Sequence, residues 1–304
     1  MKTVDVVVVG AGIAGLSAAI YLKRSSLSLV LLEKMAPGGK LLNIHEIDNY
    51  PALGSVSGPE LANKAFEQCN ALGVDYQYGN VMSIEKQGDV FYVTTDMERY
   101  EAKAVIIAVG VKPRTLGAKN EDKLLGHGIS YCAVCDGDFF TGKDVCLIGD
   151  ANTALQYAML LASKCRHVQI ATLFDHFFAD NILVEAMKKV PNISYRHCLE
   201  TQEFVGEGSL TSVKFKDTVT KESVEYTVDG CFIAIGQVPD NERFSNLLDL
   251  EKGFILTNDK METKTPGLYA AGDCRVKGMR QVVTAVNDGA IAAVNAANYL
   301  NTLQ

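Results

Sequence analysis

Two stretches of the chain open in the same way, and this duplication constrains the fold more than any other feature. Residues 4–15 read VDVVVVGAGIAG and residues 143–154 read KDVCLIGDANTA, so each places a glycine directly after an apolar strand. Matching segments follow later, IAVGVKP at 107–113 and IAIGQVP at 233–239. A continuous apolar strand, a glycine turn and a helix are typical of a buried parallel sheet. The sequence predicts an α/β fold with two Rossmann-like nucleotide-binding domains of the three-layer ββα type.

Segments of alternating polarity and the end of the chain complete this plan. Residues 89–102 and 210–230 alternate apolar and polar side chains, which is typical of antiparallel strands with one solvent-facing side. After Pro266 the chain returns to an apolar strand, a Gly-Asp turn and a long Ala-rich helix, which we expect to complete the first domain. The predicted limits are 1–115 with 243–304 for the first, discontinuous domain and 116–242 for the domain inserted into it.

Charge balance and apolar pattern exclude several classes of protein. The formal net charge is −7, whereas proteins that bind nucleic acid or acidic membranes carry clustered Lys and Arg. Asp5 interrupts the apolar start of the chain, whose glycines have nucleotide-loop spacing, so we expect no signal peptide. No other stretch is apolar for the roughly 20 residues that a membrane helix needs. We expect a cytoplasmic protein that binds neither nucleic acid nor membrane.

The first glycine loop has the spacing of a dinucleotide-binding turn. Gly10, Gly12 and Gly15 form G-x-G-x-x-G between the first strand and the amphipathic segment LSAAIYLKR. The first glycine permits a tight turn, the second lets a pyrophosphate approach the backbone, and the third lets the helix pack on the strand. Glu33 ends the next apolar strand, where a carboxylate can bind ribose hydroxyls. These features predict a dinucleotide site in the first domain.

The second glycine loop is less suited to an anion. Gly149 and Ala154 fit the first and third small positions, but Ala151 stands at the middle one, where a methyl group can obstruct a pyrophosphate. Asp150 adds a negative charge to the loop. Both residues weaken the prediction of a nucleotide site in the second domain.

Two of the eight cysteines are spaced for redox chemistry. Cys132 and Cys135 form C-x-x-C, followed at once by Asp136. In a cytosolic oxidoreductase this spacing closes a small reducible disulfide, and an adjacent carboxyl group can exchange a proton with a thiolate. Half of a metal site or two structural thiols are the alternatives, but without a second cysteine pair we expect no metal site. We expect the other six cysteines to lie in the core.

The order of these motifs resembles the low-molecular-weight thioredoxin reductases from end to end, including PGGKLLNIHEIDNYP, CAVCD and GLYAAGDCRVKGMRQVVTAVNDGAIAA. The resemblance implies FAD in the first domain, an NADPH-domain-like second domain that carries the redox disulfide, and a homodimer. Its implied catalytic residues are Cys132, Cys135 and Asp136. The residues implied to bind FAD are Gly10, Gly12, Gly15, Glu33, Gly39, Asn49, Asp273, Arg280, Gln281 and Val282. The family usually has Gln where this chain has Lys40, which changes the charge near the flavin.

The resemblance fails at the nucleotide site of the second domain. There the family carries H-R-R-x-x-x-R, whose arginines bind the 2′-phosphate of NADPH through charge-assisted hydrogen bonds. In the stretch ATLFDHFF, these positions of the chain hold Thr172, Leu173, Phe174 and Phe178. An intact flavin site and C-x-x-C with an eroded nucleotide site resemble the ferredoxin-dependent flavin thioredoxin reductases. We therefore expect ferredoxin as the electron donor and thioredoxin as the acceptor.

Three alternatives stay open. NADPH or NADH could serve as a weak donor, although Asp175 is displaced from the strand end where an acid would bind a ribose hydroxyl. The acceptor could be a protein other than thioredoxin, because C-x-x-C does not specify a partner. The chain could also be a flavin-binding sensor without catalysis. A chain that had lost its reductase function should not, however, keep both cysteines and Asp136 while losing only the nucleotide contacts.

Further expectations concern surfaces and movement. We expect the apolar side chains of 173–178 to pack in the ordinary way rather than to dock a partner. A disulfide that faces the flavin must be uncovered to reach thioredoxin, so we expect domain rotation about hinges near 112–117 and 240–246. An acidic ferredoxin needs a local positive surface, for which the candidates are Lys112, Arg114, Arg275, Lys277 and Arg280.

Overall fold

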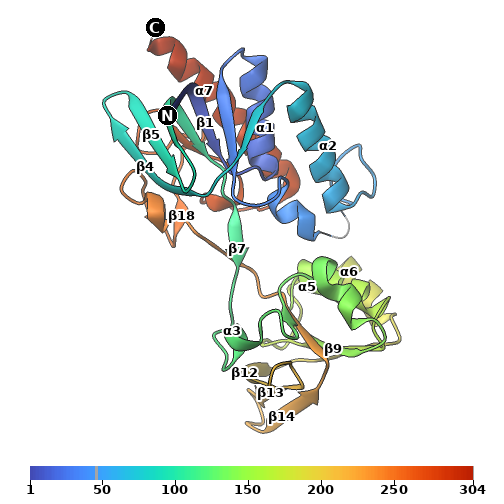
Figure 1. Cartoon of the computed structure of the whole chain (residues 1–304). Helices are drawn as coiled ribbons and strands as arrows, with labels where there is room; N and C mark the ends of the chain where they lie inside the picture. Colours follow the sequence, from blue (N-terminus) through green and yellow to red (C-terminus); the bar gives the residue numbers. More distant parts are fainter. Residues whose placement is uncertain (45–46, 304) are drawn as a thin grey trace. The chain divides into compact units, whose positions relative to one another are not determined.

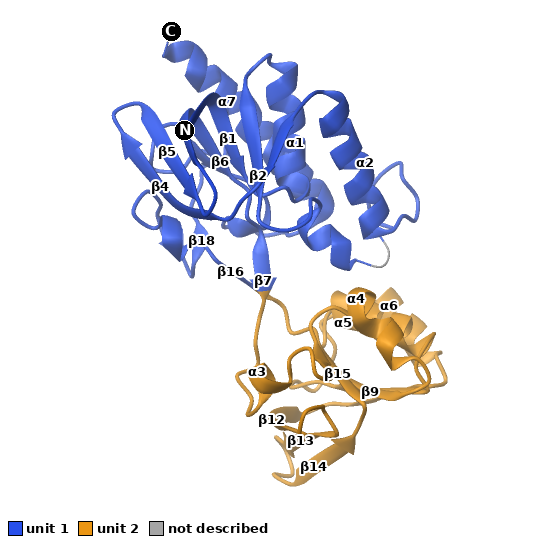
Figure 2. Cartoon of the chain, in the orientation of Figure 1, with its two compact units in different colours: residues 1–112, 238–304 blue, residues 113–237 orange. Residues whose placement is uncertain are grey.

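The computed structural model describes residues 1–44 and 47–303 (Figure 1). The chain divides into two compact units, unit 1 with residues 1–112 and 238–304 and unit 2 with residues 113–237 (Figure 2). These divisions lie within a few residues of the predicted domain limits. Positions 45 and 46 of the PGGKLLNIHEIDNYP motif, and residue 304, lie outside the described residues. Within the described residues, no helix has the length and apolar character needed to span a membrane.

Unit 1 is built on a mostly parallel sheet of seven strands. Their order is β3-β2-β1-β6-β5-β4, and β19 also pairs with β6. The apolar runs of the sequence form β1 and β6, which lie in parallel register up to Val9 opposite Ile107. The first half of β6 pairs with antiparallel β5 and the second half with parallel β19, so the end of the chain returns to this sheet. The strands are β1 (Lys2–Val9), β2 (Leu29–Glu33), β3 (Asp75–Tyr78), β4 (Val81–Gln87), β5 (Val90–Thr95), β6 (Arg99–Ile107) and β19 (Leu268–Ala270).

Helices cover one face of this sheet. The Ala-rich α7 packs closely on α1 because Gly289 has no side chain: a Cβ there would lie 2.1 Å from the backbone oxygen of Ala14. On the other face, Phe91 of β5 and Phe244 belong to a second core. The helices are α1 (Ile13–Arg24), α2 (Gly58–Ala71) and α7 (Val282–Thr302), with short 3-10 turns η1 (Gly39–Asn43), η3 (Glu242–Phe244) and η4 (Gly272–Cys274) and a small hairpin of β17 (Leu250–Glu251) and β18 (Phe254–Ile255).

Unit 2 repeats the plan with a five-stranded parallel sheet in the order β11-β10-β9-β15-β8. Helices α5 and α6 pack on one face, and the antiparallel sheet β12-β13-β14 packs on the other. The predicted α/β fold with two Rossmann-like domains is confirmed. The elements are α3 (Glu121–Leu124), β8 (Ile129–Ser130), α4 (Ala133–Asp136), η2 (Gly137–Phe140), β9 (Asp144–Ile148), α5 (Asn152–Ala162), β10 (His167–Ala171), α6 (Asn181–Lys188), β11 (Ile193–Arg196), β12 (Leu199–Val205), β13 (Ser212–Asp217), β14 (Ser223–Thr227) and β15 (Gly230–Ile233).

One edge of the unit 2 sheet collects the segments of chemical interest. β8 pairs with β15 as β19 pairs with β6 in unit 1. Because β8, β9 and β10 run parallel, the segments after Ser130, Ile148 and Ala171 leave the sheet at the same edge. The carboxyl edge of a parallel sheet is where such folds bind ligands. The chain passes between the units in β7 (Val111–Pro113) and β16 (Gln237–Pro239), which pair with each other.

Candidate functional site

The first glycine loop, between β1 and α1, uses its glycines in two ways. A Cβ at Gly10 would lie 2.5 Å from the oxygen of Ala108, and one at Gly15 would lie 1.8 Å from the oxygen of Gly10. Packing therefore requires glycine at both positions. Gly12 is the N-cap residue of α1 with a φ of −68°, which any residue adopts, and a Cβ there would meet nothing within 4 Å. The missing side chain of Gly12 keeps a space open at the helix N-terminus, as a pyrophosphate requires.

Glu33 and Gly39 line the surroundings of this loop. Glu33 ends β2 and accepts hydrogen bonds from the backbone N–H groups of Ala11, through Oε2 (2.8 Å), and of Met35, through Oε1 (3.0 Å). Gly39 approaches the loop so closely that a Cβ would lie 3.2 Å from the Cα of Gly12. The structure thus brings together these predicted residues from two separate segments.

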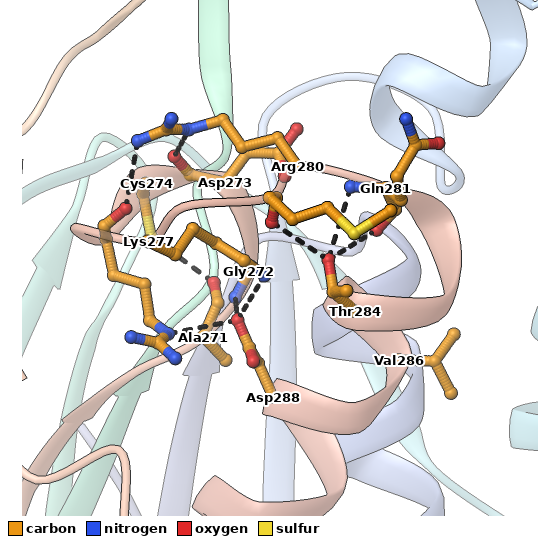
Figure 3. A network of polar contacts seen from close by, with 12 residues as sticks. Ala271, Gly272, Asp273, Cys274, Lys277, Arg280, Gln281, Thr284, Val286 and Asp288 are labelled. Carbon is orange, nitrogen blue, oxygen red and sulfur yellow. Dashed lines mark hydrogen bonds and ion pairs between the residues drawn. The ribbon is translucent and has the colours of Figure 1, made fainter. Parts of the chain in front are cut away.

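Asp273, in the turn η4 after β19, has a buried oxygen without a partner. Among the described residues, no group hydrogen-bonds to Oδ1 of Asp273. Its Oδ2 lies 3.5 Å from Nζ of Lys40, so the lysine that replaces the usual Gln places a positive charge here. Arg280 donates to the backbone oxygen of Asp273 (3.4 Å) (Figure 3). The same guanidinium also stacks on Phe254, 4.1 Å from the ring centroid. Since a buried unpaired acceptor is unfavourable, a ligand hydroxyl would complete this site.

The turn that carries Asp273 is held by Asp288, which sequence reasoning missed. Oδ2 of this buried carboxylate accepts hydrogen bonds from the N–H of Gly272 (3.1 Å), Nε of Arg275 (3.0 Å) and Nζ of Lys277 (2.7 Å) (Figure 3). The side chains of Arg275 and Lys277 are 14% and 7% exposed. Three donors on one oxygen fix the turn to α7. The available signal was an aspartate on an otherwise apolar face of the helix.

Asn49, Gln281 and Val282 meet at the start of α7. Asn49 Nδ2 donates to Oε1 of Gln281 (3.2 Å). Gln281 is the N-cap residue and forms a capping box with Thr284. Val282 begins the helix and packs against a small core that includes Leu41 of η1. Two predicted segments, far apart in sequence, are therefore joined at the N-terminus of one helix.

These features fit the expected cofactor. FAD has a pyrophosphate, which suits the open space at Gly12, and a polyhydroxylated chain, whose hydroxyl groups can donate to the unpaired Oδ1 of Asp273. The donors and acceptors of unit 1 thus match the groups of FAD.

The redox pair lies in unit 2, at the edge where the parallel strands end. A disulfide joins Cys132 and Cys135 around the short helix α4, with Cα atoms 5.3 Å apart. Cys132 is half-buried and Cys135 is exposed, while Ala133 between them is buried in the core and fixes the turn. Of the six other cysteines, five are buried and Cys198 is half-buried. Unit 2 therefore carries a formed disulfide in which one of the two cysteines is exposed.

The two residues before Cys132 complete its surroundings, and sequence reasoning missed both. Ser130 Oγ donates to Oδ2 of Asp136 (2.6 Å) and accepts from the N–H of Cys132 (2.9 Å). Tyr131 points elsewhere: its hydroxyl donates to Oε1 of the buried Glu121 (2.6 Å). Burial, together with this carboxylate, raises the pKa of Tyr131, so the phenol stays protonated. Of the two neighbouring hydroxyls, that of Ser130 serves Asp136.

The second glycine loop differs from the first in space and charge. Ala151 is the N-cap residue of α5 with a φ of −106°, so its backbone needs no glycine. Burial raises the pKa of the adjacent Asp150 carboxyl. The segment after β10 is hydrogen-bonded to this loop: the N–H of Phe178 donates to the oxygen of Asp150 (2.8 Å), and Asn152 Nδ2 donates to Asp180 Oδ2 (2.7 Å). The loop thus carries carboxylates and bonds to its own chain where a nucleotide phosphate would need donors.

Uncharged residues hold the positions of the missing arginines. Leu173, Phe174 and Phe178 are 48%, 49% and 57% exposed, so the expectation of ordinary packing is wrong for these three. The loop between β10 and α6 lies at the sheet edge, where its side chains contact one another, as Phe174 and Phe178 do with ring centroids 5.2 Å apart. Of the aromatic residues in this loop, Phe177 packs partly buried against the unit 2 core.

The buried Thr172 and the nearby Arg196 are committed to other groups. Thr172 Oγ1 donates to the oxygen of Phe174 (2.8 Å) and lies 2.7 Å from Nδ1 of His197. The guanidinium of Arg196, on the neighbouring strand β11, donates to Oδ2 of Asp217 (2.8 Å). The hydroxyl of Thr172 is therefore committed within unit 2, and the guanidinium of Arg196 is paired with a carboxylate.

Two of the five candidate cations for a positive surface do not face a partner. The side chains of Arg275 and Lys277 are largely buried, and both are paired with Asp288. Lys112 Nζ lies 3.5 Å from Oδ1 of Asp240, which partly neutralises it. Sequence alone could not show that these cations are used inside unit 1.

Comparisons with known proteins agree along the whole chain. The family model described as pyridine nucleotide-disulphide oxidoreductase matches residues 4–289. The thioredoxin reductase of Bacillus subtilis is 39% identical, covering 100% of this chain and 96% of that protein. The crystal structure of Lactococcus lactis thioredoxin reductase matches with a TM-score of 0.95 at 37% identity, covering 98% of this chain and 99% of that one.

The expected special closeness to ferredoxin-dependent enzymes is not supported. A crystal structure of a ferredoxin-flavin thioredoxin reductase from Clostridium acetobutylicum matches with a TM-score of 0.56 at 31% identity, covering 99% of both chains. Both values are lower than those for the Lactococcus lactis structure.

Proposed function

Because the chain belongs to the pyridine nucleotide-disulphide oxidoreductases, and among them to the thioredoxin reductases, we propose that it carries electrons through FAD and the Cys132–Cys135 disulfide to thioredoxin, with ferredoxin as the donor. The chain is a flavoprotein disulfide reductase. The donor is the finer part of the proposal and rests on unit 2. By resemblance to the family, we also propose a cytoplasmic homodimer.

The cofactor of the enzyme is FAD. Gly12, Glu33, Gly39 and Asp273 would hold its pyrophosphate, ribose and ribityl groups, and the residues at the start of α7 would lie by the flavin. FAD takes up electrons singly or in pairs, so it can link a one-electron donor to a two-electron disulfide. The buried carboxylate of Asp288, which is hydrogen-bonded to the turn that carries Asp273, would keep this turn in place when the charge of the cofactor changes.

The observation that carries the proposed activity is the Cys132–Cys135 disulfide with Asp136 beside it. Reduction of this disulfide consumes two electrons and two protons. We assign to Asp136 the delivery of one proton to a departing thiolate. A thiolate of the reduced pair then attacks the disulfide of thioredoxin, and the resulting mixed disulfide is resolved by the second thiol.

The choice of donor is supported by the chemistry of the second loop. Binding of NADPH through its 2′-phosphate calls for arginines, whereas Leu173, Phe174 and Phe178 offer no hydrogen-bond donors in their side chains. Asp150 and Asp180 would repel the phosphates. A protein that delivers electrons directly to the flavin needs no such site, which favours ferredoxin.

An anaerobic absorbance experiment tests the donor and the activity in turn. The FAD-loaded protein is mixed separately with NADPH, NADH and reduced ferredoxin, and oxidised thioredoxin is then added. We expect ferredoxin alone to bleach the flavin rapidly, with thioredoxin thiols appearing afterwards. Rapid bleaching by NADPH or NADH would overturn the donor and leave the reductase activity standing.

The Cys135→Ser variant is the control for the disulfide. We expect its flavin to be reduced as in the wild type, while no thioredoxin thiols appear. A protein that fails to reduce thioredoxin even in wild-type form, and whose Cys132–Cys135 pair stays oxidised when the flavin is reduced chemically, would be a flavin-binding sensor. Reduction of another disulfide protein in preference to thioredoxin would change the acceptor only.

A further inference from the structure

Ser130 occupies a position from which it can govern the proton on Asp136. It ends β8 and is 6% exposed. Its Oγ is 2.6 Å from Oδ2 of Asp136, 2.9 Å from the N of Cys132 and 3.3 Å from the O of Cys132. One hydroxyl therefore contacts both the carboxyl group and the backbone of a redox cysteine.

The valence of the hydroxyl allows two arrangements without movement of heavy atoms. A serine hydroxyl has one proton to donate and two lone pairs. When Asp136 is ionised, Ser130 donates to the carboxylate. The 2.6 Å distance between the two oxygens is typical of a hydrogen bond from a hydroxyl group to a charged oxygen. When Asp136 is protonated, the carboxyl group donates to Ser130, whose own proton turns to the O of Cys132. In both arrangements one lone pair accepts the N–H of Cys132.

We propose that Ser130 is a positioning residue for proton transfer at the disulfide: it holds Asp136 in place and stabilises both of its protonation states. The proposal rests on the role assigned to Asp136 above. When the S–S bond takes up the two electrons that bound FAD would supply, it breaks, one thiolate takes the proton of Asp136 and the other takes a proton from water. The proton lost by Asp136 is replaced from solvent, while Ser130 returns to donating to the carboxylate.

The neighbouring Tyr131 provides a matched control. It is also a partly buried hydroxyl bonded to a carboxylate, but its partner is Glu121 rather than Asp136. Removing its hydroxyl in Tyr131→Phe therefore changes a similar hydrogen bond one residue closer to the disulfide. If local packing alone mattered, the two substitutions would act alike.

The test compares Ser130→Ala, Ser130→Thr, Asp136→Asn, the Ser130→Ala/Asp136→Asn double variant and Tyr131→Phe, all as FAD-loaded full chains. The flavin is reduced photochemically without oxygen, and free thiols are trapped and counted over time. We expect Ser130→Ala to slow disulfide reduction by roughly tenfold, the factor expected when one hydrogen bond to a charged group is lost. Ser130→Thr should restore most of the rate, because it keeps the hydroxyl, and Tyr131→Phe should match the wild type.

The double variant separates positioning from structure. If Ser130 acts through Asp136, the double variant should be as slow as Asp136→Asn alone. A further loss in the double variant equal to that of Ser130→Ala, or a wild-type rate in Ser130→Ala, would overturn the proposal while leaving Asp136 in its role. A wild-type rate in Asp136→Asn would instead remove the proton assignment of the proposed function, and the inference about Ser130 with it.

Discussion

The glycine loops of the two units have similar backbones but differ in the space and the charge at the start of the following helix. Gly12 and Ala151 are both N-cap residues in extended conformation, with φ of −68° and −106°, so neither backbone requires glycine. Unit 1 nevertheless has a glycine there, and a Cβ would enter open space. Unit 2 has a methyl group, an adjacent carboxylate and a hydrogen bond to its own chain. A glycine that the backbone does not need leaves open space that suits a ligand, whereas the methyl group of Ala151 stands at the corresponding place in unit 2.

The two units also differ in their buried carboxylates. In unit 1, Asp288 accepts from two cations and one backbone N–H. In unit 2, Glu121 accepts from neutral donors, the hydroxyl of Tyr131 and the N–H groups of Leu116 (3.0 Å) and Gly117 (2.7 Å). The first therefore neutralises buried charge, whereas the second only satisfies hydrogen bonds.

The largest effect expected from this difference is on stability. Asp288→Asn leaves two largely buried cations unpaired, so we expect it to lower the free energy of unfolding by about 3–5 kcal/mol. Glu121→Gln keeps an acceptor oxygen and should cost less, about 1–3 kcal/mol. Urea denaturation followed by circular dichroism measures both. Equal losses would show that the cations of unit 1 are paired elsewhere or solvated.

Rebuilding the second loop is the next largest change. The variant Asp150→Gly/Ala151→Gly/Leu173→Arg/Phe174→Arg/Phe178→Arg restores the space and the charges that the family uses. Each hydrogen bond to a phosphate contributes about 1.5–3 kcal/mol, so we expect flavin reduction by NADPH to become at least about tenfold faster. The control has Gln in place of the three arginines and should show no such gain. If the rate of flavin reduction by NADPH stays unchanged in the arginine variant, then features outside this loop prevent the use of NADPH.

A smaller effect is expected from closing the space at Gly12. Gly12→Ala should leave the apo protein as stable as the wild type, because its φ suits alanine, yet weaken FAD binding by about tenfold, or about 1.4 kcal/mol. The mirror change, Ala151→Gly, should leave the FAD content unaltered. Both are measured by flavin fluorescence titration of apo protein. A loss of stability with no loss of affinity would mean that Gly12 serves packing.

The smallest expected effect concerns the charge of the second loop. Burial raises the pKa of Asp150 above its ordinary 3.8, so its ionised form destabilises the folded state at neutral pH. Asp150→Asn should therefore raise the thermal unfolding midpoint slightly at pH 7, and the gain should vanish as the pH falls to the ordinary value. In the exposed Asp175, hydrogen bonding to His176 lowers the pKa, so Asp175→Asn should give no gain. A gain independent of pH would exclude ionisation as its cause.

Much of this protein follows from its sequence, because the deciding signals are local. The G-x-G-x-x-G turn, the C-x-x-C pair and the repeated apolar strands each depend on residues a few positions apart, so they predicted the doubled α/β fold and the C-x-x-C disulfide pair. The loss of the basic cluster in ATLFDHFF was equally local. The exposure of the apolar side chains in this stretch could not be predicted locally, because it depends on where the loop between β10 and α6 lies at the edge of the sheet.

The tertiary structure decided which distant groups meet. From the sequence, Arg275 and Lys277 were expected to be surface cations, and only the packing of α7 against η4 brings them into contact with Asp288. The sequence gives no sign that Ser130 has a polar partner, and only the short helix α4 turns the chain so that Asp136 meets its hydroxyl. Sequence spacing determines which chemical groups a turn can carry, but the partner of a buried polar group is chosen by the packing of segments that the sequence keeps apart.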